Sequence, residues 1–162
     1  VAVQVARSLG AHVTAVCSGR NAELVRQLGA DRVIDYTVDD FTTLPDRYDV
    51  ILDNVSQHSL RALRGVLTAR GSLIPNGGSI GGENWGSVGY LVRAAIANLF
   101  IRERLVTFTS SVRQRDLDEL TAMVEAATLT PVIDTVYPLS QVAAALDHVG
   151  AGHTRGKVLV KP

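Results

Sequence analysis

The sequence has little cysteine, few aromatic residues and no excess of charge of either sign. Its 162 residues include one cysteine, Cys17, which excludes an internal disulfide and a metal site built from cysteines and is typical of a reducing compartment. We therefore expect a cytoplasmic protein. The 16 Lys and Arg residues balance the 16 Asp and Glu residues, so no overall field would attract nucleic acid or an anionic membrane. Any binding of an anion must depend on a local group.

Long apolar runs and recognisable catalytic clusters are also missing. The longest apolar run, residues 89–101, is too short to cross a bilayer and has Arg93 in its middle. The four histidines do not have the spacing of metal ligands, and no pair of carboxylates or Ser/His/Asp set is placed for catalysis. The sequence therefore predicts neither a metal site nor a catalytic side chain.

What the sequence does contain is a regular alternation of short aliphatic strands and amphipathic helices. Strands are predicted at residues 12–17, 32–35, 48–53, 72–76, 105–109, 132–136 and 157–160, and helices at 1–9, 21–28, 59–67, 88–100, 116–127 and 140–149. This alternation is typical of crossover connections, and it predicts an α/β fold with a parallel sheet that helices cover on both faces. Pro131 and Pro138 place a boundary near residue 130. We expect one domain at 1–130, and a segment at 131–162 that packs on its flank or belongs to a neighbouring lobe.

The sequence begins inside a predicted helix whose apolar stripe is Val1, Val5 and Leu9. No capping residue precedes this helix, although the first N–H groups of a helix normally have one. We therefore expect the chain to have been cut from a longer one.

The segments AVCSGRN, ELVRQLGADRVIDY, YDVILDNVS and SLIPNGG, with the ending from TPVIDTVYPLSQ to GKVLVKP, resemble the cofactor-binding half of medium-chain dehydrogenase/reductases. The most similar branch is that of the zinc-lacking quinone oxidoreductases and zeta-crystallin. The resemblance covers nearly the whole chain and implies a Rossmann-like, doubly wound parallel sheet. Members of this family have a first strand and a glycine-rich turn before the helix that opens this sequence, so we expect both to be missing here.

The resemblance implies the cofactor-binding part of an NADPH-dependent, zinc-independent oxidoreductase. The whole enzyme would transfer hydride to a small-molecule substrate, a quinone, an enone or a similar activated alkene or carbonyl compound, and the present chain alone is expected to be inactive. Two alternatives come from other classes. One is a non-catalytic α/β binding or scaffold domain, and the other is an enoyl-reductase module of a multienzyme.

The turn after the second strand of such a fold distinguishes the two nicotinamide cofactors. An acid there binds the ribose 2′-hydroxyl of NAD, whereas an arginine accommodates the 2′-phosphate of NADP. Ser18, Gly19, Arg20 and Asn21 occupy this place, and a guanidinium matches the geometry of a phosphate. The sequence therefore predicts that these four residues bind NADP. The alternative is that Asn21 only caps the next helix and that Arg20 is solvated.

Further cofactor contacts are implied at the ends of later strands, where ligands of open α/β sheets gather. The residues concerned are Tyr36, Asn54, Val55, Asn76, Gly77 and Gly78. Each also has an ordinary structural explanation, since tyrosine is common at the rim of a sheet and asparagine and glycine are common in turns. Finally, in relatives the strand corresponding to residues 105–109 pairs with its counterpart in a second subunit, so we expect a homodimer.

Overall fold

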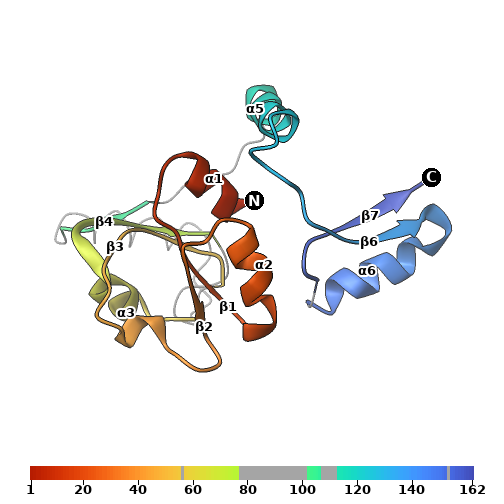
Figure 1. Cartoon of the computed structure of the whole chain (residues 1–162). Coiled ribbons are helices and arrows are strands. Elements are labelled where there is room, and N and C mark those ends of the chain that lie inside the picture. The colour runs from red at the N-terminus through yellow and green to blue at the C-terminus, as the bar shows by residue number, and fades with distance from the viewer. Residues whose placement is uncertain (56, 77–101, 107–112, 153) are drawn as a thin grey trace. The chain divides into compact units, whose positions relative to one another are not determined.

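The computed structural model describes residues 1–55, 57–76, 102–106, 113–152 and 154–162 (Figure 1). Its contacts divide the chain into two compact units, one formed by Val1–Asp39 with Val112–Pro162 and the other by Asp40–Ser111. The predicted helix at 88–100 and residues 107–109 of the predicted edge strand lie outside the described residues. The predicted division of the chain after residue 130 stays a prediction.

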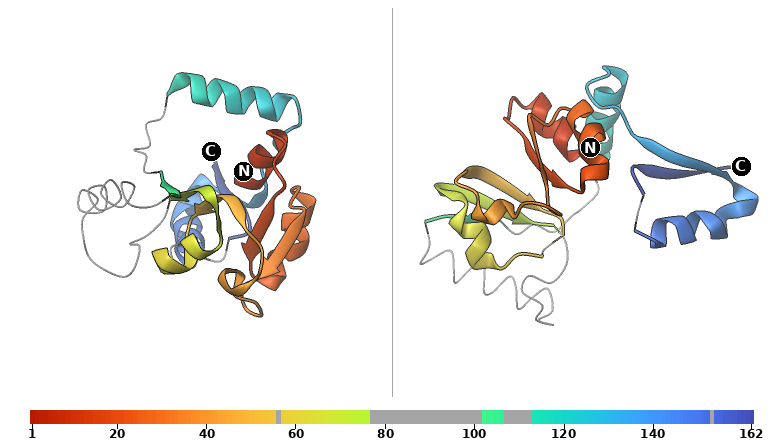
Figure 2. Two further views of the ribbon diagram at one scale, coloured as in Figure 1. Left: turned by 90° about the vertical axis from the view of Figure 1, so that its left-hand side faces the viewer. Right: turned by 60° about the horizontal axis from the view of Figure 1, so that its bottom comes forward.

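The first unit contains two parallel strand pairs, each joined by a helix. Its elements are α1 (Ala2–Ser8), β1 (Thr14–Cys17), η1 (Gly19–Asn21), α2 (Ala22–Gln27), β2 (Arg32–Asp35), α5 (Gln114–Glu125), β6 (Ile133–Pro138), η4 (Leu139–Gln141), α6 (Val142–Gly150) and β7 (Lys157–Lys161). Strand β1 pairs in parallel with β2, and β6 pairs in parallel with β7. Helix α2 packs on β2, and α6 runs alongside β6 and β7 (Figure 2). Both pairs are therefore crossover units of the kind that the alternating pattern predicts.

The second unit is a three-stranded parallel sheet with a leucine core. It contains η2 (Phe41–Thr43), β3 (Tyr48–Asp53), α3 (Leu60–Gly65), β4 (Leu67–Pro75) and β5 (Arg104–Leu105), with the strands in the order β3-β4-β5. The side chains of Leu63, Leu67, Leu73 and Leu105 are buried together. Burial of these apolar side chains holds α3 against the sheet.

The pattern of alternation identified the strands correctly and misplaced some of their ends. Strands β2 and β3 occupy the predicted residues, whereas β4 begins at Leu67, inside the predicted helix 59–67. The pairing of β3 with β4 shifts register between Tyr48, opposite Leu67, and Val50, opposite Ser72. This irregularity adds residues to β4 that alternation alone does not reveal. Every strand pairing among the described residues is parallel, so the α/β fold class is confirmed.

Helix α1 buries a different face from the predicted one. Leu9 is 81% exposed and Val1 is 55% exposed, whereas Gln4 is only 9% exposed. The helix ends at Ser8, so Leu9 lies past its last turn. The side-chain amide of Gln4 pairs with the backbone of Thr130, donating from Nε2 to the carbonyl oxygen (3.0 Å) and accepting from the N–H (2.6 Å). A polar pair therefore attaches α1 to the segment after α5.

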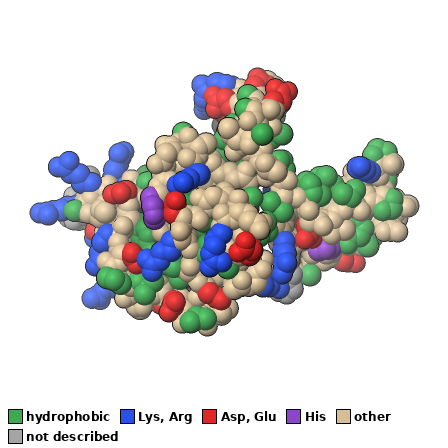
Figure 3. All heavy atoms as spheres, in the orientation of Figure 1, with side chains coloured by type: hydrophobic (Ala, Val, Ile, Leu, Met, Phe, Trp, Pro, Cys, Tyr) green, Lys and Arg blue, Asp and Glu red, His purple; other side chains and the backbone are tan. Residues whose placement is uncertain are grey.

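The surface has no dominant sign of charge on the face drawn in Figure 3, where acidic and basic side chains are interspersed. This distribution matches the balanced composition of the sequence. None of the described helices combines the length and apolar character needed to span a membrane.

Candidate functional site

The turn that follows β1 is a short 3-10 helix held by its own backbone. Ser18 is extended, with φ −71° and ψ 149°, and the N–H of Asn21 donates to the carbonyl oxygen of Ser18 at 2.8 Å. The side chain of Asn21 makes no capping hydrogen bond to α2. Its Nδ2 atom instead lies 3.4 Å from Ser18 Oγ, and its buried Oδ1 atom has no hydrogen-bond partner among the residues that the structure describes. Helix capping therefore does not explain Asn21.

A carboxylate from the neighbouring strand lies against this turn. Asp35 ends β2 and stands opposite Cys17 in the parallel register. It accepts hydrogen bonds from the N–H (2.9 Å) and hydroxyl (2.7 Å) of Thr37 and from the N–H of Gly19. These donors, those of Thr37 first, lower the pKa of Asp35. A Cβ atom on Gly19 would overlap Asp35 Oδ2, so a larger residue there would require the carboxylate to shift.

Asp35 was not among the residues predicted for the site. The contact with Gly19 shows that it borders the predicted turn. The signal that could have identified it was available, because adjacent parallel strands end at the same edge of a sheet and residues 17 and 35 are the last positions of two successive predicted strands.

Two of the predicted ligands present exposed groups beside the same edge. Arg20 is exposed within the turn. Tyr36 follows β2 directly, donates its N–H to the carbonyl oxygen of Cys17 at 3.2 Å and is 59% exposed. A cation and an aromatic ring therefore stand at the carboxyl ends of β1 and β2, where both are accessible to a ligand.

The second unit carries the other predicted residues at the corresponding edge of its own sheet. Asn76 follows β4 and donates from Nδ2 to Asn54 Oδ1 at 2.7 Å and from its N–H to the carbonyl oxygen of Asp53, also at 2.7 Å. Val55 donates its N–H to Asp53 Oδ1 at 3.2 Å and is 67% exposed. The structure thus brings Asn54, Val55 and Asn76 together, whereas Gly77 and Gly78 lie outside the described residues. Their contact with a cofactor stays a prediction.

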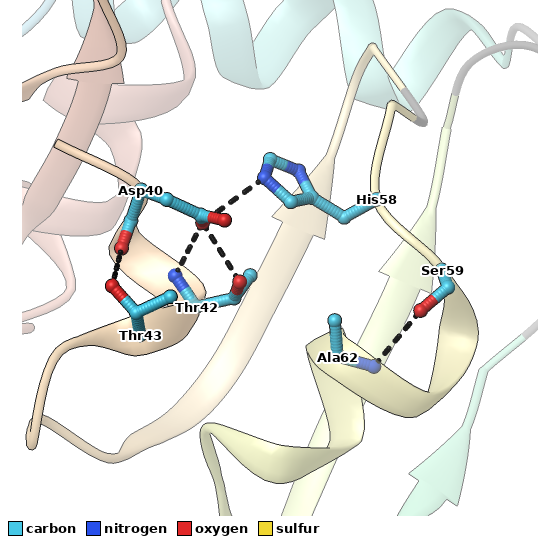
Figure 4. Close-up of polar contacts among 6 residues, drawn as sticks. All are labelled: Asp40, Thr42, Thr43, His58, Ser59 and Ala62. Atoms are coloured by element: carbon cyan, nitrogen blue, oxygen red, sulfur yellow. Dashed lines mark hydrogen bonds and ion pairs between the residues drawn. The ribbon is translucent and has the colours of Figure 1, made fainter. Parts of the chain in front are cut away.

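Two histidines are each paired with an aspartate. His58 Nε2 lies 3.3 Å from Asp40 Oδ1 (Figure 4). The His58 ring stands edge-on to Phe41 at 4.9 Å between centroids. His148 Nε2 lies 3.0 Å from Asp134 Oδ2, and its Nδ1 atom lies 2.9 Å from the hydroxyl of Tyr137. These pairs fasten the loop before α3 to η2 and fasten α6 to β6. Among the described residues, no three His, Cys, Asp or Glu side chains are grouped as metal ligands.

Asp40 makes a testable contribution to stability at acidic pH. It caps η2 by accepting from the hydroxyl (2.7 Å) and N–H (2.9 Å) of Thr42, and these bonds, with a smaller contribution from His58, lower its pKa. The folded state thus holds the proton less tightly than the unfolded chain, whose aspartates have a pKa of about 3.9. The stabilisation is complete above that value and is lost as the pH falls through the lower, folded-state pKa.

We expect Asp40→Ala to cost about 1 kcal/mol at pH 7, the usual worth of a capping side chain. Asp40→Asn should cost less, because an amide oxygen still caps, and it should flatten the dependence of stability on pH below pH ~4. Urea unfolding followed by circular dichroism between pH 3 and 7 measures both effects. An unchanged pH dependence in Asp40→Asn would contradict this account.

Comparison with known proteins identifies the family. Residues 28–160 match the family described as zinc-binding dehydrogenase. The chain belongs to this family of medium-chain dehydrogenase/reductases. It is 36% identical to mitochondrial NAD(P)H oxidoreductase RTN4IP1 of Mus musculus, matching 98% of the chain and 44% of that protein. It is 30% identical to chloroplastic quinone-oxidoreductase QR1 of Triphysaria versicolor, matching 99% of the chain and 48% of that protein.

A solved structure gives the same fold. The quinone oxidoreductase from Coxiella burnetii superposes with a TM-score of 0.76 over 99% of the chain and 48% of that structure, at 23% identity. The chain thus spans slightly less than half the length of these relatives. Since the names of the two curated relatives place them in organelles, the cytoplasmic location stays a prediction.

The residues at the β1–β2 edge fit the adenosine end of a dinucleotide. The exposed guanidinium of Arg20 can hold a phosphate, and the exposed ring of Tyr36 offers an amphipathic surface. The buried Oδ1 atom of Asn21 has no hydrogen-bond donor among the described residues. The chain therefore places an arginine, an aromatic ring and an amide side chain within one turn and the strand beside it.

Proposed function

We propose that this chain is the cofactor-binding part of an NADPH-dependent oxidoreductase that transfers hydride to a quinone, an enone or a similar activated alkene or carbonyl compound. Membership of the family and the names of the two curated relatives support a nicotinamide-dependent oxidoreductase. The bound cofactor would supply the hydride chemistry, and the residues of this chain would bind and orient it. A quinone or related acceptor is supported by the name of QR1.

The observation that carries the choice of NADPH is the turn after β1. It presents Arg20 as an exposed cation and has no acidic residue of its own. An arginine at this place accommodates a 2′-phosphate, whereas the ribose 2′-hydroxyl of NAD is held by an acid. A hydrogen bond to a charged group contributes more than one between neutral groups. The 2′-phosphate would therefore gain most from Arg20.

In the whole protein, we expect Arg20→Ala to weaken the binding of NADPH by roughly 1.5–3 kcal/mol, or about 10- to 150-fold. The binding of NADH should hardly change, because NADH lacks the 2′-phosphate. Titration of each cofactor by fluorescence measures the two dissociation constants. Arg115→Ala is a matched control, because Arg115 is an exposed arginine of α5 whose Nε atom lies 3.8 Å from Glu119 Oε1; it should leave both constants within about twofold of their original values, as a surface substitution does.

Two results would contradict the proposal in different ways. Equal losses for NADPH and NADH would mean that Arg20 supports the fold and not the phosphate. Binding of neither cofactor by the unaltered whole protein would instead favour the non-catalytic scaffold domain.

We also propose that the protein is a homodimer formed through the edge strand at residues 105–109. Arg104 and Leu105 form β5. Leu105 is 5% exposed and pairs in parallel with Leu73 of β4. Among the described residues β5 is the end strand of the order β3-β4-β5, and an end strand of a sheet can pair with a strand of a second copy, which supports the proposal.

A further inference from the structure

We propose that Asp35 limits the preference of this protein for NADPH over NADH. The inference rests on the proposed function, because it assumes that the turn formed by Ser18, Gly19, Arg20 and Asn21 receives the adenosine ribose. Asp35, on the strand next to this turn, would thus take part in selecting the cofactor.

The N–H of Gly19 is already bonded to Asp35. Gly19 is the first residue of η1, and the free N–H groups at the start of a helical turn normally attract anions. Here the carboxylate of Asp35 already accepts that N–H, and its Oδ2 atom fills the space beside Gly19 Cα. An incoming phosphate therefore cannot use this donor unless Asp35 moves, and it depends on Arg20 and the side chains around it.

Hydrogen bonds from the residues that follow it hold Asp35 in this position. Its Oδ1 atom is held by the N–H and the hydroxyl of Thr37 at 2.9 and 2.7 Å. Its own backbone carbonyl accepts from the N–H groups of Val38 and Asp39 at 3.1 and 2.9 Å. Thr37 thus holds the carboxylate, and Val38 and Asp39 hold the backbone that carries it, so Asp35 does not easily move when a ligand arrives.

The negative charge of Asp35 opposes the binding of a phosphate at the turn. The negative charge of Asp35 is felt across the strand pair, since after burial it is the main cause that raises the pKa of the Cys17 thiol. A 2′-phosphate at the turn carries one or two negative charges and is repelled by Asp35, while a neutral 2′-hydroxyl is not. Arg20 and Asp35 therefore act in opposite directions on the phosphate, and the balance between them sets the ratio of the two affinities.

The test is Asp35→Asn in the whole protein, with the dissociation constants of NADP⁺ and NAD⁺ measured by isothermal titration calorimetry at constant ionic strength. Asparagine keeps an amide oxygen for Gly19 or Thr37 and removes the charge. We expect the dissociation constant of NADP⁺ to fall about 3- to 10-fold, a typical effect of one nearby charge at a partly exposed site, and that of NAD⁺ to change less than about twofold, within the usual range of a surface substitution.

Asp31→Asn is the matched control. Asp31 directly precedes β2, and its carboxylate, like that of Asp35, is bound to a backbone N–H, that of Val13, at 2.7 Å, and also to Arg7. It lies near the start of β1, at the opposite end of the strand from the turn. Its substitution should leave the ratio of the two affinities unchanged.

If the ratio of the two affinities in Asp35→Asn is unchanged or moves toward NAD⁺, the proposal is overturned. Equal losses of affinity for both cofactors would also overturn it, because they indicate a purely structural role. If Asp35→Asn does not fold, as judged by circular dichroism, Asp35→Thr offers a hydroxyl acceptor on a strand-favouring residue and is judged by the same ratio. Failure of the proposed function looks different, because the unaltered protein would then bind neither cofactor or Arg20→Ala would weaken both equally.

Discussion

Leu73→Ala should lower the free energy of unfolding by about 3–4 kcal/mol, the middle of the range for a fully buried leucine. Leu73 is 0% exposed in the central strand of the β3-β4-β5 sheet and packs in one cluster with Leu63, Leu67 and Leu105. Alanine would remove apolar area from this cluster and leave a cavity, because the strands on both sides of β4 restrict any collapse around it. Denaturation with urea, followed by circular dichroism, measures the loss.

Leu52→Ala provides the comparison within the same sheet. Leu52 belongs to β3 and is 42% exposed, so its truncation should cost about 1 kcal/mol, in proportion to the smaller apolar area that it buries. Equal losses for the two substitutions would mean that Leu73 does not occupy the centre of a packed core.

Gln4→Leu should destabilise the protein by about 2–3 kcal/mol, because it removes two hydrogen bonds and leaves polar backbone groups of Thr130 without their partner. The amide of Gln4 serves both groups, with distances of 3.0 Å to the carbonyl oxygen and 2.6 Å from the N–H. Leucine is close to glutamine in size, so the substitution tests the polar pair and not the filling of space. The measurement is again the free energy of unfolding in urea.

Gln4→Glu separates the donor from the acceptor. At neutral pH a carboxylate can still accept the N–H of Thr130 but repels its carbonyl oxygen, so stability should fall. In acid the protonated side chain can both accept and donate, and part of the loss relative to the unaltered protein should be recovered. Gln27→Leu is the control, since within the described part of the chain the exposed side chain of Gln27 bonds to Glu23 alone; it should cost less than about 0.5 kcal/mol. A comparable loss from Gln27→Leu would show that the pair with Thr130 is not special.

Much of the candidate site follows from the order of the strands along the chain. Adjacent parallel strands end at one edge of their sheet, so the residues that follow β1 and β2 gather at the edge of one sheet, and those that follow β3 and β4 gather at the edge of another. Ser18 to Asn21 and Tyr36 lie together for this reason, and so do Asn54 and Asn76, which are joined by a hydrogen bond of 2.7 Å. These placements need only the period of the pattern and the direction of the strands.

The sequence by itself determined the local structure, because the alternation of apolar residues and the positions of the turns depend on neighbours a few places away. It also determined that an arginine and no acid lies in the turn after β1. Only the tertiary structure decided which polar side chains act at a distance. The side chain of Gln4 bonds to the backbone of Thr130, 126 residues away, and the carboxylate of Asp35 at the end of β2 contacts Gly19 in the turn after β1. Such contacts depend on register and on the side-chain geometry of packed elements, which no local pattern records.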